Sequence, residues 1–299
     1  MIYSKETIDP DLLKAVKKDF YKSNSVLYIA NKYSLTYNEV LCLLNEAGIK
    51  PDRLKKLLCE YDLGSESFII ISDTHLGSAL ENIKYLDRIY EYATINNIKT
   101  ILHTGDLFQS TLRPVDKSFT DPFKQVEHVV KDYPKDDNIR NYILFGNHDF
   151  HLLRRDDELY QVVSSRSDFN ILGFKKAYFL WNKFLFSANH EIEHYKLQLP
   201  NIDPYLRFVG HRHELKVVGD KTIMVPTLSE DIKRYDKYNY PGFLVVKKEN
   251  NRLRVFHYII KDFTDTPEEN YGTPIPIFPH GAILSKSLLK RNICKRKRK

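Results

Sequence analysis

The sequence has few of the features that mark a secreted, membrane-spanning or zinc-ribbon protein. Its 299 residues include only three cysteines, Cys42, Cys59 and Cys294. Thiols so few and so scattered exclude a disulfide-stapled fold and a zinc ribbon. The longest apolar stretches, such as residues 68–71, fall far short of the roughly 18 residues that a membrane-spanning helix needs. Residues 1–20 contain no apolar segment typical of a signal peptide. We therefore expect a cytoplasmic protein with no membrane partner.

Acidic residues are absent from the C-terminal end, and this absence accounts for the net charge of +7. Residues 286–299 carry eight basic residues and no acidic one, so residues 1–285 have a net charge of −1, the total of +7 less the +8 of the tail. A basic tail of this kind can bind phosphates, act as an address signal or simply remain solvated. The charge therefore makes nucleic acid one candidate partner of the tail and says little about the folded body.

The apolar content is sufficient for a large core and excludes global disorder. Hydrophobic residues make up 42% of the chain and aromatic residues 13%, and at this length about three quarters of the unfolded chain's surface can be buried. Length alone suggests about two domains. We expect a helical module over residues 1–63, a larger domain over residues 64–261, and a proline-containing extension with the basic tail over residues 262–299.

Residues 11–61 are patterned as a set of short helices. Apolar residues recur at helical spacing, a third helix is expected over residues 37–47, and Pro51 would open a fourth. Residues 25–49 resemble a helix-turn-helix, which implies DNA binding. The module contains ten basic and nine acidic residues, however, so a packing module or one that recruits a protein partner is an equal alternative.

From residue 68 onward, short apolar runs alternate with helical stretches. The first runs are residues 68–72, 100–104 and 142–146, and the helices expected between them are residues 83–96 and 122–133. This βαβ rhythm is typical of a buried parallel sheet. After about residue 170 strand patterns dominate, so we predict an α/β domain rich in sheet with its helices concentrated in the first half.

Five of the apolar runs end in side chains that can bind a metal ion. These side chains are Asp73 and His75, then Asp106, then Asn147, His148 and Asp149, then His190, and finally His211 and His213. Since α/β sheets place their sites at strand ends, we expect this set to converge. Two divalent cations roughly 3.5 to 4 Å apart need several anionic or imidazole ligands and a shared bridging group. A lone Asp106 would more often be a turn residue and a lone His190 a core histidine; it is the set that predicts a two-metal site.

These motifs resemble those of the calcineurin-like metallophosphoesterase superfamily. The signatures are Asp73-Thr74-His75, Gly105-Asp106, Gly146-Asn147-His148-Asp149, His190 and Gly210-His211-Arg212-His213, within residues 68–260. The resemblance implies a β-sandwich flanked by helices, with the site at one rim of the sheets. It also implies two divalent metal ions. Manganese is the first expectation, and the mixed nitrogen and oxygen ligands also suit iron, zinc, nickel or cobalt.

The resemblance further implies a ligand set. One ion would be held by Asp73, His75, Asp106 and His213, and the second by Asp106, Asn147, His190 and His211, with Asp106 bridging. His194 lies close enough in sequence to compete with His190. Because the histidines must be neutral at the ligating nitrogen, binding should weaken in acid.

His148 and Asp149 are implied to act in catalysis without binding metal. His148 would stabilise the phosphoryl charge or protonate the leaving oxygen, with Asp149 orienting its imidazole. Attack would come from a metal-activated water in line with the leaving group.

The form of the motifs favours a nuclease or phosphodiesterase over a protein phosphatase. SDTHLGS, GDLFQS and GNHDF differ from the longer signatures of protein Ser/Thr phosphatases and are more similar to the nuclease and phosphodiesterase branch. Only 40 residues separate Asp149 from His190, which leaves little room for the large insertion expected of a double-strand-break nuclease. We expect hydrolysis of nucleic acid. The alternatives are a phosphodiesterase of nucleotides or other small esters, and a DNA-binding or recruited regulatory protein with a vestigial metal site. Four arginines could bind a further phosphate or be solvated: Arg113, Arg154, Arg155 and Arg166.

Overall fold

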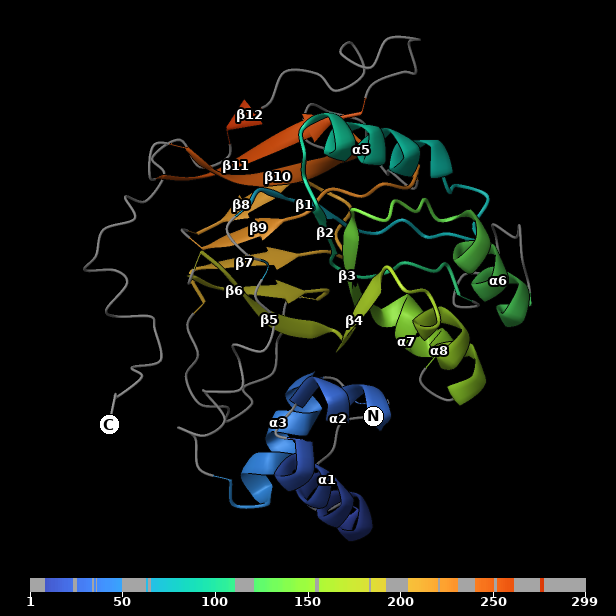
Figure 1. Ribbon diagram of the computed structural model, residues 1–299, viewed down its shortest axis with the longest axis vertical. Coiled ribbons are helices and arrows are strands. Elements are labelled where there is room, and N and C mark those ends of the chain that lie inside the picture. The colour runs from blue at the N-terminus through green and yellow to red at the C-terminus, as the bar shows by residue number, and fades with distance from the viewer. Residues whose placement is uncertain are drawn as a thin grey trace.

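A computed structural model of the chain consists of two β-sheets packed face to face, with helices against the outer face of the larger sheet and beside one edge of the smaller sheet (Figure 1). The structure describes residues 9–23, 26–33, 35, 37–49, 63, 66–110, 121–153, 156–182, 184–191, 204–219, 221–230, 240–249, 252–260 and 275–276. The helix expected from Pro51 and the basic tail over 286–299 lie outside these residues.

The larger sheet has seven strands in the order β12-β11-β10-β1-β2-β3-β4. They are β1 (Phe68–Ile71), β2 (Thr100–His103), β3 (Arg140–Phe145), β4 (Phe169–Phe174), β10 (Gly242–Glu249), β11 (Arg252–Ile259) and β12 (Ile275–Pro276). Strands β1 to β4 are parallel, and β10 lies antiparallel to β1. The carboxyl ends of β1, β2 and β3 therefore lie at one edge of the sheet, where the motif loops begin.

The smaller sheet has five strands in the order β5-β6-β7-β9-β8. They are β5 (Lys176–Trp181), β6 (Phe184–Asn189), β7 (Leu206–Val209), β8 (Lys216–Val218) and β9 (Thr222–Met224). Strands β6, β7 and β9 are parallel to one another, and β5 and β8 are antiparallel to their neighbours.

Strand β1 shows why these runs are apolar on both faces. Successive side chains of a strand point to opposite faces of its sheet. Phe68 and Ile70 join the core between the two sheets, while Ile69 and Ile71 join the core beneath the helices. The inter-sheet core is rich in aromatic rings, with Phe68 making edge-to-face contacts, and its partners are Phe179, Trp181, Phe186 and Phe208. Burial on both faces leaves the strand no position for a polar residue.

Four helices cover the outer face of the larger sheet (Figure 1). They are α5 (Ile83–Ile95), α6 (Pro122–Asp132), α7 (Asn147–Leu153) and α8 (Asp157–Ser164). The expected helices over 83–96 and 122–133 correspond to α5 and α6. The short helices α7 and α8 were not predicted.

Three N-terminal helices pack beside the edge strand β5 of the smaller sheet and next to β4 of the larger sheet (Figure 1). They are α1 (Pro10–Ser23), α2 (Val26–Lys32) and α3 (Tyr37–Glu46). Their buried residues, among them Val16, Phe20 and Leu44, form a third apolar cluster that includes Tyr178 of β5. Gly48, with a φ of +79°, follows the end of the third helix in the left-handed conformation common at helix C-termini.

The predicted α/β sandwich flanked by helices is confirmed. In the described part of the chain, every helix is too short or too polar to traverse a bilayer.

Candidate metal centre

The candidate ligands come together because each directly follows the end of a strand. Asp73 and His75 follow β1, Asp106 follows β2, Asn147 and His148 begin α7 after β3, His190 follows β6, and His211 and His213 follow β7. Two of the strands belong to the smaller sheet and three to the larger. The site therefore lies at a shared rim of the sandwich, and both sheets contribute to it.

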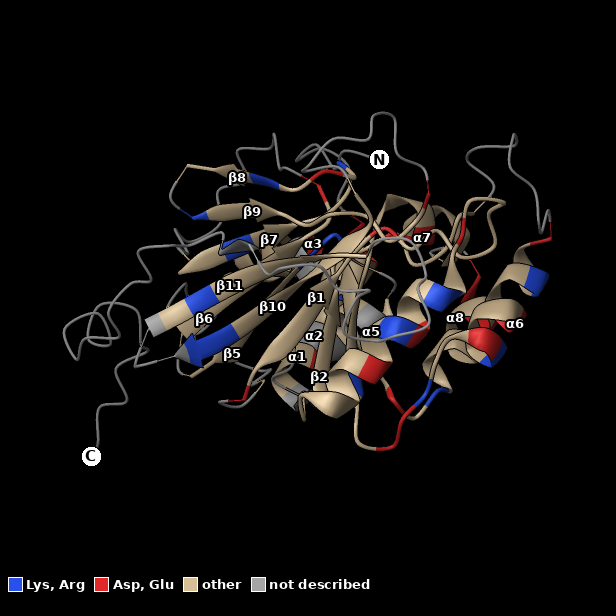
Figure 2. Ribbon diagram, turned by 90° about the horizontal axis from the view of Figure 1, so that it is seen from above, with Lys and Arg blue, Asp and Glu red and all other residues tan. Residues whose placement is uncertain are grey.

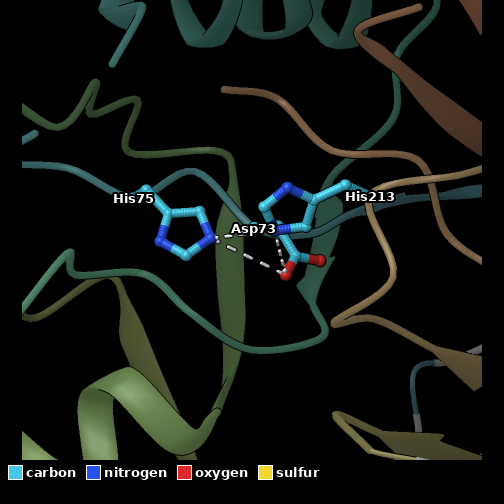
Figure 3. Close-up of side chains that lie close together, drawn as sticks. All are labelled: Asp73, His75 and His213. Atoms are coloured by element: carbon cyan, nitrogen blue, oxygen red, sulfur yellow. Dashed lines mark hydrogen bonds and ion pairs between the residues drawn. The ribbon is translucent and has the colours of Figure 1, made fainter. Parts of the chain in front are cut away.

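One group of side chains consists of Asp73, His75 and His213 (Figure 3). The Nε2 atom of His213 lies 3.3 Å from Oδ1 of Asp73 and 3.0 Å from Nε2 of His75. The Nε2 atom of His75 lies 3.9 Å from the same carboxylate oxygen of Asp73. Three potential ligand atoms thus face one another across the distances that a single cation could bridge.

A second group consists of Asp106, Asn147, His190 and His211. The Nε2 atom of His190 lies 2.9 Å from Oδ2 of Asp106 and 3.0 Å from Oδ1 of Asn147. A ring nitrogen of His211 lies within 4.8 Å of a carboxylate oxygen of Asp106 and of a ring nitrogen of His190. Asp106 also lies 3.9 Å from Nε2 of His75 in the first group. Asp106 is therefore the carboxylate that stands between the two groups.

The two carboxylates at the centre are buried without a lysine or arginine beside them. Asp73 is 0% and Asp106 1% exposed, and within the described residues their ion-pair partners are all histidines. Burial of unpaired charge costs several kcal/mol per ion, as an order of magnitude. The environment therefore favours additional positive charge at this point.

The pKa values of the side chains at the centre reflect the same electrostatic environment. Burial would raise the pKa of Asp73, but the surrounding imidazoles, His213 foremost, hold it well below its usual range. For Asp106 burial acts in the same sense, and His190 and His75 lower its pKa to about 2. Burial would lower the pKa of His190, yet Asp106 and Asp73 raise it to about 10. The carboxylates thus stay ionised and draw a positive charge, which a proton or a divalent metal can supply.

The orientation of His190 fits a metal ligand. Its Nδ1–H donates to the backbone carbonyl of Thr104 at 3.0 Å, which fixes the ring and turns Nε2 toward the oxygens of Asp106 and Asn147. Such a bond from the far ring nitrogen is the usual companion of a metal-ligating histidine. Burial lowers the pKa of His75 to about 4 and also lowers the pKa of His211. Neutral imidazoles with carboxylate and amide oxygens are a donor set suited to divalent transition metals.

The backbone at the centre is strained. Asp73, His75, Asp106, His211 and His213 have φ angles of +53°, +46°, +54°, +74° and +56°. The left-handed region is uncommon for residues other than glycine and costs about 1–3 kcal/mol per residue where the fold enforces it. Five of the nine non-glycine residues with positive φ in the described chain are candidate ligands, so the strain is concentrated where the side chains must converge.

The glycines of the motifs are required by close packing around the ligands. A Cβ atom on Gly105 would collide with the ring of His190, and one on Gly146 would collide with the carboxylate and backbone nitrogen of Asp106. A Cβ atom on Gly210 would collide with the hydroxyl of Ser72. Each motif therefore pairs a ligand with a residue small enough to let another motif approach.

Backbone hydrogen bonds continue the pairing of β1 and β2 beyond the strand ends. Asp73 N donates to Gly105 O at 2.9 Å, His75 N to Asp106 O at 3.1 Å and Leu76 N to Leu107 O at 2.8 Å. These bonds hold the first two motif loops side by side, which fixes Asp73 and His75 relative to Asp106.

Asp149 holds two motif loops together, and the expectation that it orients the imidazole of His148 is wrong. Its carboxylate accepts hydrogen bonds from the backbone nitrogens of Gly146, Leu107 and Phe108, at 2.7, 3.1 and 2.8 Å. Burial and the neighbouring Asp106 raise the pKa of Asp149 to about 7, and the three donors oppose that rise. With its oxygens engaged in this way, Asp149 acts on the loops and not on the ring.

The imidazole of His148 is oriented by a backbone carbonyl instead. Its Nδ1–H donates to Gln109 O, and its backbone nitrogen donates to Oδ1 of Asp106 at 2.9 Å. A ring nitrogen of His148 also lies within 4.8 Å of ligand atoms of His75 and Asp106. His148 is thus at the edge of the centre, with Nε2 free of hydrogen-bond partners among the described residues.

His103 is a site residue that the sequence did not reveal. It is buried at the end of β2, and burial lowers its pKa to about 3. Gly105 N donates to its Nδ1 at 3.2 Å, so the hydrogen resides on Nε2, which donates to Oγ1 of Thr74 at 3.1 Å. Thr74 in turn donates to Leu107 O at 3.1 Å. His103 therefore links the first two motif loops, although in the sequence it is simply the last residue of an apolar run.

Arg166 is structural, contrary to the suggestion that it binds a phosphate or is solvated. It is buried, pairs with both oxygens of Asp168 at 3.0 and 2.8 Å, and donates to Tyr133 O at 2.7 Å at the end of α6. Its guanidinium also lies over the ring of Phe169, 4.5 Å from the centroid. Arg113, Arg154, Arg155 and His194 lie outside the described residues.

Comparison with known proteins identifies a family that matches most of the chain. Residues 67–259 match the family described as calcineurin-like phosphoesterase. A comparison with curated protein sequences gave no match.

Several solved structures are similar to the chain at low identity. Vacuolar protein sorting 29 from Cryptosporidium parvum has 15% identity and a TM-score of 0.42, over 66% of this chain and 92% of that chain. The phosphoesterase Yfce from E. coli has 17% identity and a TM-score of 0.41, over 71% and 99%. The nuclease MPE from Pseudomonas putida has 13% identity and a TM-score of 0.35, over 62% and 85%.

Proposed function

Because the chain belongs to the calcineurin-like phosphoesterase family, we propose that it hydrolyses phosphodiester bonds with two divalent metal ions and that its substrate is nucleic acid. Membership of the family implies hydrolase activity and the use of divalent metals. Three parts of the proposal go beyond family membership: that the bond is a phosphodiester, that two metal ions are bound, and that the substrate is a nucleic-acid polymer.

The observation that carries the proposal is the pair of buried carboxylates, Asp73 and Asp106, whose ion-pair partners among the described residues are all histidines. Folding does not require such a set, since burying charged groups costs several kcal/mol per ion, as an order of magnitude. One ion would be held by Asp73, His75, Asp106 and His213, and the other by Asp106, Asn147, His190 and His211. When bound, the ions supply the positive charge that activates water and offsets the charge of the phosphoryl group.

His148 is proposed as the residue that protonates the leaving oxygen. Its Nδ1 is engaged with Gln109 O, so Nε2 is the nitrogen that can carry a proton to the substrate. General acid catalysis by a positioned side chain contributes about 10²–10⁴-fold to rate, and most for leaving groups that are basic. Asp149 supports this role by holding the loop that carries His148 against the loop that carries Asp106.

Nucleic acid is proposed as the substrate because the net positive charge lies in the tail over residues 286–299. The described body is mixed in charge, and Figure 2 shows both basic and acidic segments along α5 and α6. A tail that binds phosphates would supply affinity for a polymer that this body does not provide. The helix-turn-helix-like module over residues 1–63 is a second region that could contact DNA or a protein partner.

The metal dependence is tested by removing the shared carboxylate. We expect Asp106→Asn to lower metal affinity and kcat by more than about 100-fold, measured by metal content after dialysis and by hydrolysis of bis-p-nitrophenyl phosphate with Mn²⁺. The matched control is Asp157→Asn, at an exposed position of α8, which should retain both properties. Activity that survives a chelator and the Asp106 substitution would remove the metal-dependent hydrolase from consideration.

The substrate is tested with a panel of esters and two deletions. Purified protein with Mn²⁺ would be assayed on bis-p-nitrophenyl phosphate, p-nitrophenyl phosphate, single- and double-stranded DNA, RNA and cyclic nucleotides. We expect polymer cleavage that persists without residues 1–63, falls without residues 286–299 and declines steeply with salt. Turnover confined to small esters would overturn the nucleic-acid substrate, and sequence-selective DNA binding without turnover would favour a regulatory protein.

A further inference from the structure

Helix α6 contacts the loop after the second motif through one buried amide side chain. Gln125 is 1% exposed, and its Oε1 accepts a hydrogen bond from Ser110 N at 2.9 Å while its Nε2 donates to Ser110 O at 3.3 Å. We propose that Gln125 is a positioning residue for His148, a proposal that rests on the acid role of His148 proposed above.

The connection between Gln125 and His148 is a single peptide plane. The carbonyl of Gln109, which accepts the Nδ1–H of His148, and the N–H of Ser110, which donates to Gln125, belong to the same peptide bond. That unit is planar and rigid. His148 therefore donates a hydrogen bond to one edge of the plane and Gln125 accepts one from the opposite edge. Rotation of the plane would break both of these hydrogen bonds. A bond to the N–H also polarises the carbonyl and strengthens it as an acceptor.

The backbone conformation at Ser110 is one that the hydrogen bonds to Gln125 help to stabilise. Ser110 has a φ of +57°, which is unfavourable for serine. The backbone before the plane is held separately, because Gln109 N donates to Leu76 O at 2.9 Å. Gly77 gives Gln125 the room it requires, since a Cβ atom there would lie 2.8 Å from Cγ of Gln125. The amide thus accepts the hydrogen bond from the N–H edge of the plane at a position where the backbone is already strained.

Loss of the amide should therefore act on the acid and leave the metals in place. When the hydrogen bond from Ser110 N to Gln125 is lost, the peptide plane is held less firmly, the Gln109 carbonyl fixes the ring of His148 less well, and Nε2 is less often aimed at the leaving oxygen. The effect should depend on the leaving group, because an activated ester needs little protonation.

The first test is Gln125→Met, which keeps a side chain of similar volume and removes the two hydrogen bonds to Ser110. We expect kcat for a diester with an alkyl leaving group to fall about tenfold, while kcat for bis-p-nitrophenyl phosphate changes by less than about twofold, with KM and metal content unchanged. Glu127→Ala, at an exposed position of the same helix, is the control and should leave both rates unchanged. Equal losses for the two esters, in parallel with a lower Tm, would show that Gln125 only stabilises the fold.

A double-mutant cycle and a conservative variant separate the two roles further. In a His148→Ala background, Gln125→Met should cause no additional loss for the alkyl ester; additive losses would overturn the proposal. Gln125→Glu offers the same donor and acceptor only while its carboxyl is protonated, so its activity relative to the native chain should recover as pH falls. A ratio that is independent of pH would contradict the hydrogen-bonded role.

A spectroscopic readout is independent of whether the protein hydrolyses any ester. In ¹⁵N-labelled protein, the hydrogen-bonded Nδ1–H of His148 should give a resonance that disappears in Gln125→Met and persists in Glu127→Ala. An unchanged resonance in Gln125→Met would refute the positioning role even if the enzyme is active. Loss of the resonance in an inactive protein would uphold the positioning of the ring and count only against the proposed function.

Discussion

Gly146 illustrates how single residues allow the candidate metal ligands to converge. A Cβ atom at this position would collide with the Asp106 carboxylate and lie 2.7 Å from Cδ2 of His190. We expect Gly146→Ala to push these two residues apart, at a cost of about 1–3 kcal/mol in stability for the overpacking. Metal affinity, measured by titration with Mn²⁺, should fall at least about tenfold.

The control for Gly146 is a glycine in open space. A Cβ atom on Gly219 would have no heavy atom within 4 Å, although its φ is +63°. Gly219→Ala should therefore cost about 1–2 kcal/mol in stability through the backbone alone and leave metal affinity unchanged. Equal metal affinities in the two variants would show that the close approach of the motif loops is dispensable.

His257 is a buried polar residue whose removal should stabilise the protein. It is 0% exposed on β11, and neither ring nitrogen has a hydrogen-bond partner among the residues that the structure describes. Burial lowers its pKa to about 4, so the unfolded chain, with a pKa of about 6.5, binds the proton first and stability is lost as pH falls from about 6.5 toward 4. We expect His257→Leu to gain about 1 kcal/mol at pH 7.5 and more at pH 5.5, measured by urea denaturation.

A histidine on the surface isolates the effect of burial. His151 is exposed on α7, and His151→Leu should show a difference from the native chain that does not grow as pH falls. A loss of stability in His257→Leu at both pH values would mean that the imidazole makes a favourable interaction, and the stated cause would be wrong.

At the scale of elements, helix α6 is tied to the loop after the first motif by a histidine held between two carboxylates. His128 on α6 lies with Nε2 at 2.9 Å from Glu81 and Nδ1 at 2.8 Å from Asp132. The hydrogen bond to Glu81 is the main cause of a raised pKa for His128, which burial opposes and Asp132 supports. The second oxygen of Glu81 accepts from Gly77 N in the loop. The tether is strongest when the ring is protonated and donates from both nitrogens.

The pH dependence of this tether has a definite sign. Because the folded pKa is raised, the stabilisation is fully present below the unfolded value of about 6.5 and is lost as pH rises through the folded value. We expect His128→Gln to lower stability by about 0.5–1 kcal/mol at pH 6 and by less at pH 9. Thermal unfolding of both proteins at the two pH values measures this, and a difference that grows toward pH 9 would contradict it.

The elements that could be predicted from the sequence are those with a strong apolar pattern. Strand β1 and helix α5 follow from a continuous run and a helical period, and the placement of Asp73 and Asp106 follows from the strand ends. The helix α7 was missed because its seven residues begin inside a motif. The partner of Asp149 and the tautomer of His103 could not be predicted, since they depend on how three loops distant in sequence turn toward one another.

At the scale of the whole molecule, three apolar clusters divide the described chain. The first cluster lies between the larger sheet and its helices, and the second lies between the two sheets. Strands such as β1 contribute one face to each of these clusters. The third cluster is built by α1, α2 and α3, and among the described residues the sandwich contributes the buried Tyr178 and the partly buried Leu185 to it. In this part of the chain the N-terminal helices therefore share fewer buried apolar side chains with the sandwich than the two sheets share with each other.

Tyr178 should for that reason control whether the N-terminal helices and the sandwich unfold together. It is 4% exposed, and its neighbours Ala177 and Phe179 point into the cluster between the two sheets. We expect Tyr178→Ala to destabilise the docked helices by about 3 kcal/mol, so that urea unfolding separates into two transitions and a protease cleaves within residues 1–63 before the sandwich unfolds. Hydrolysis of bis-p-nitrophenyl phosphate should persist, because the metal centre lies at the rim of the sheets.

Tyr21→Ala, at a 54% exposed position of α1, is the matched substitution and should change stability by less than about 0.5 kcal/mol. If Tyr178→Ala instead shifts one cooperative transition and activity falls with it, the helices and the sandwich form a single folding unit.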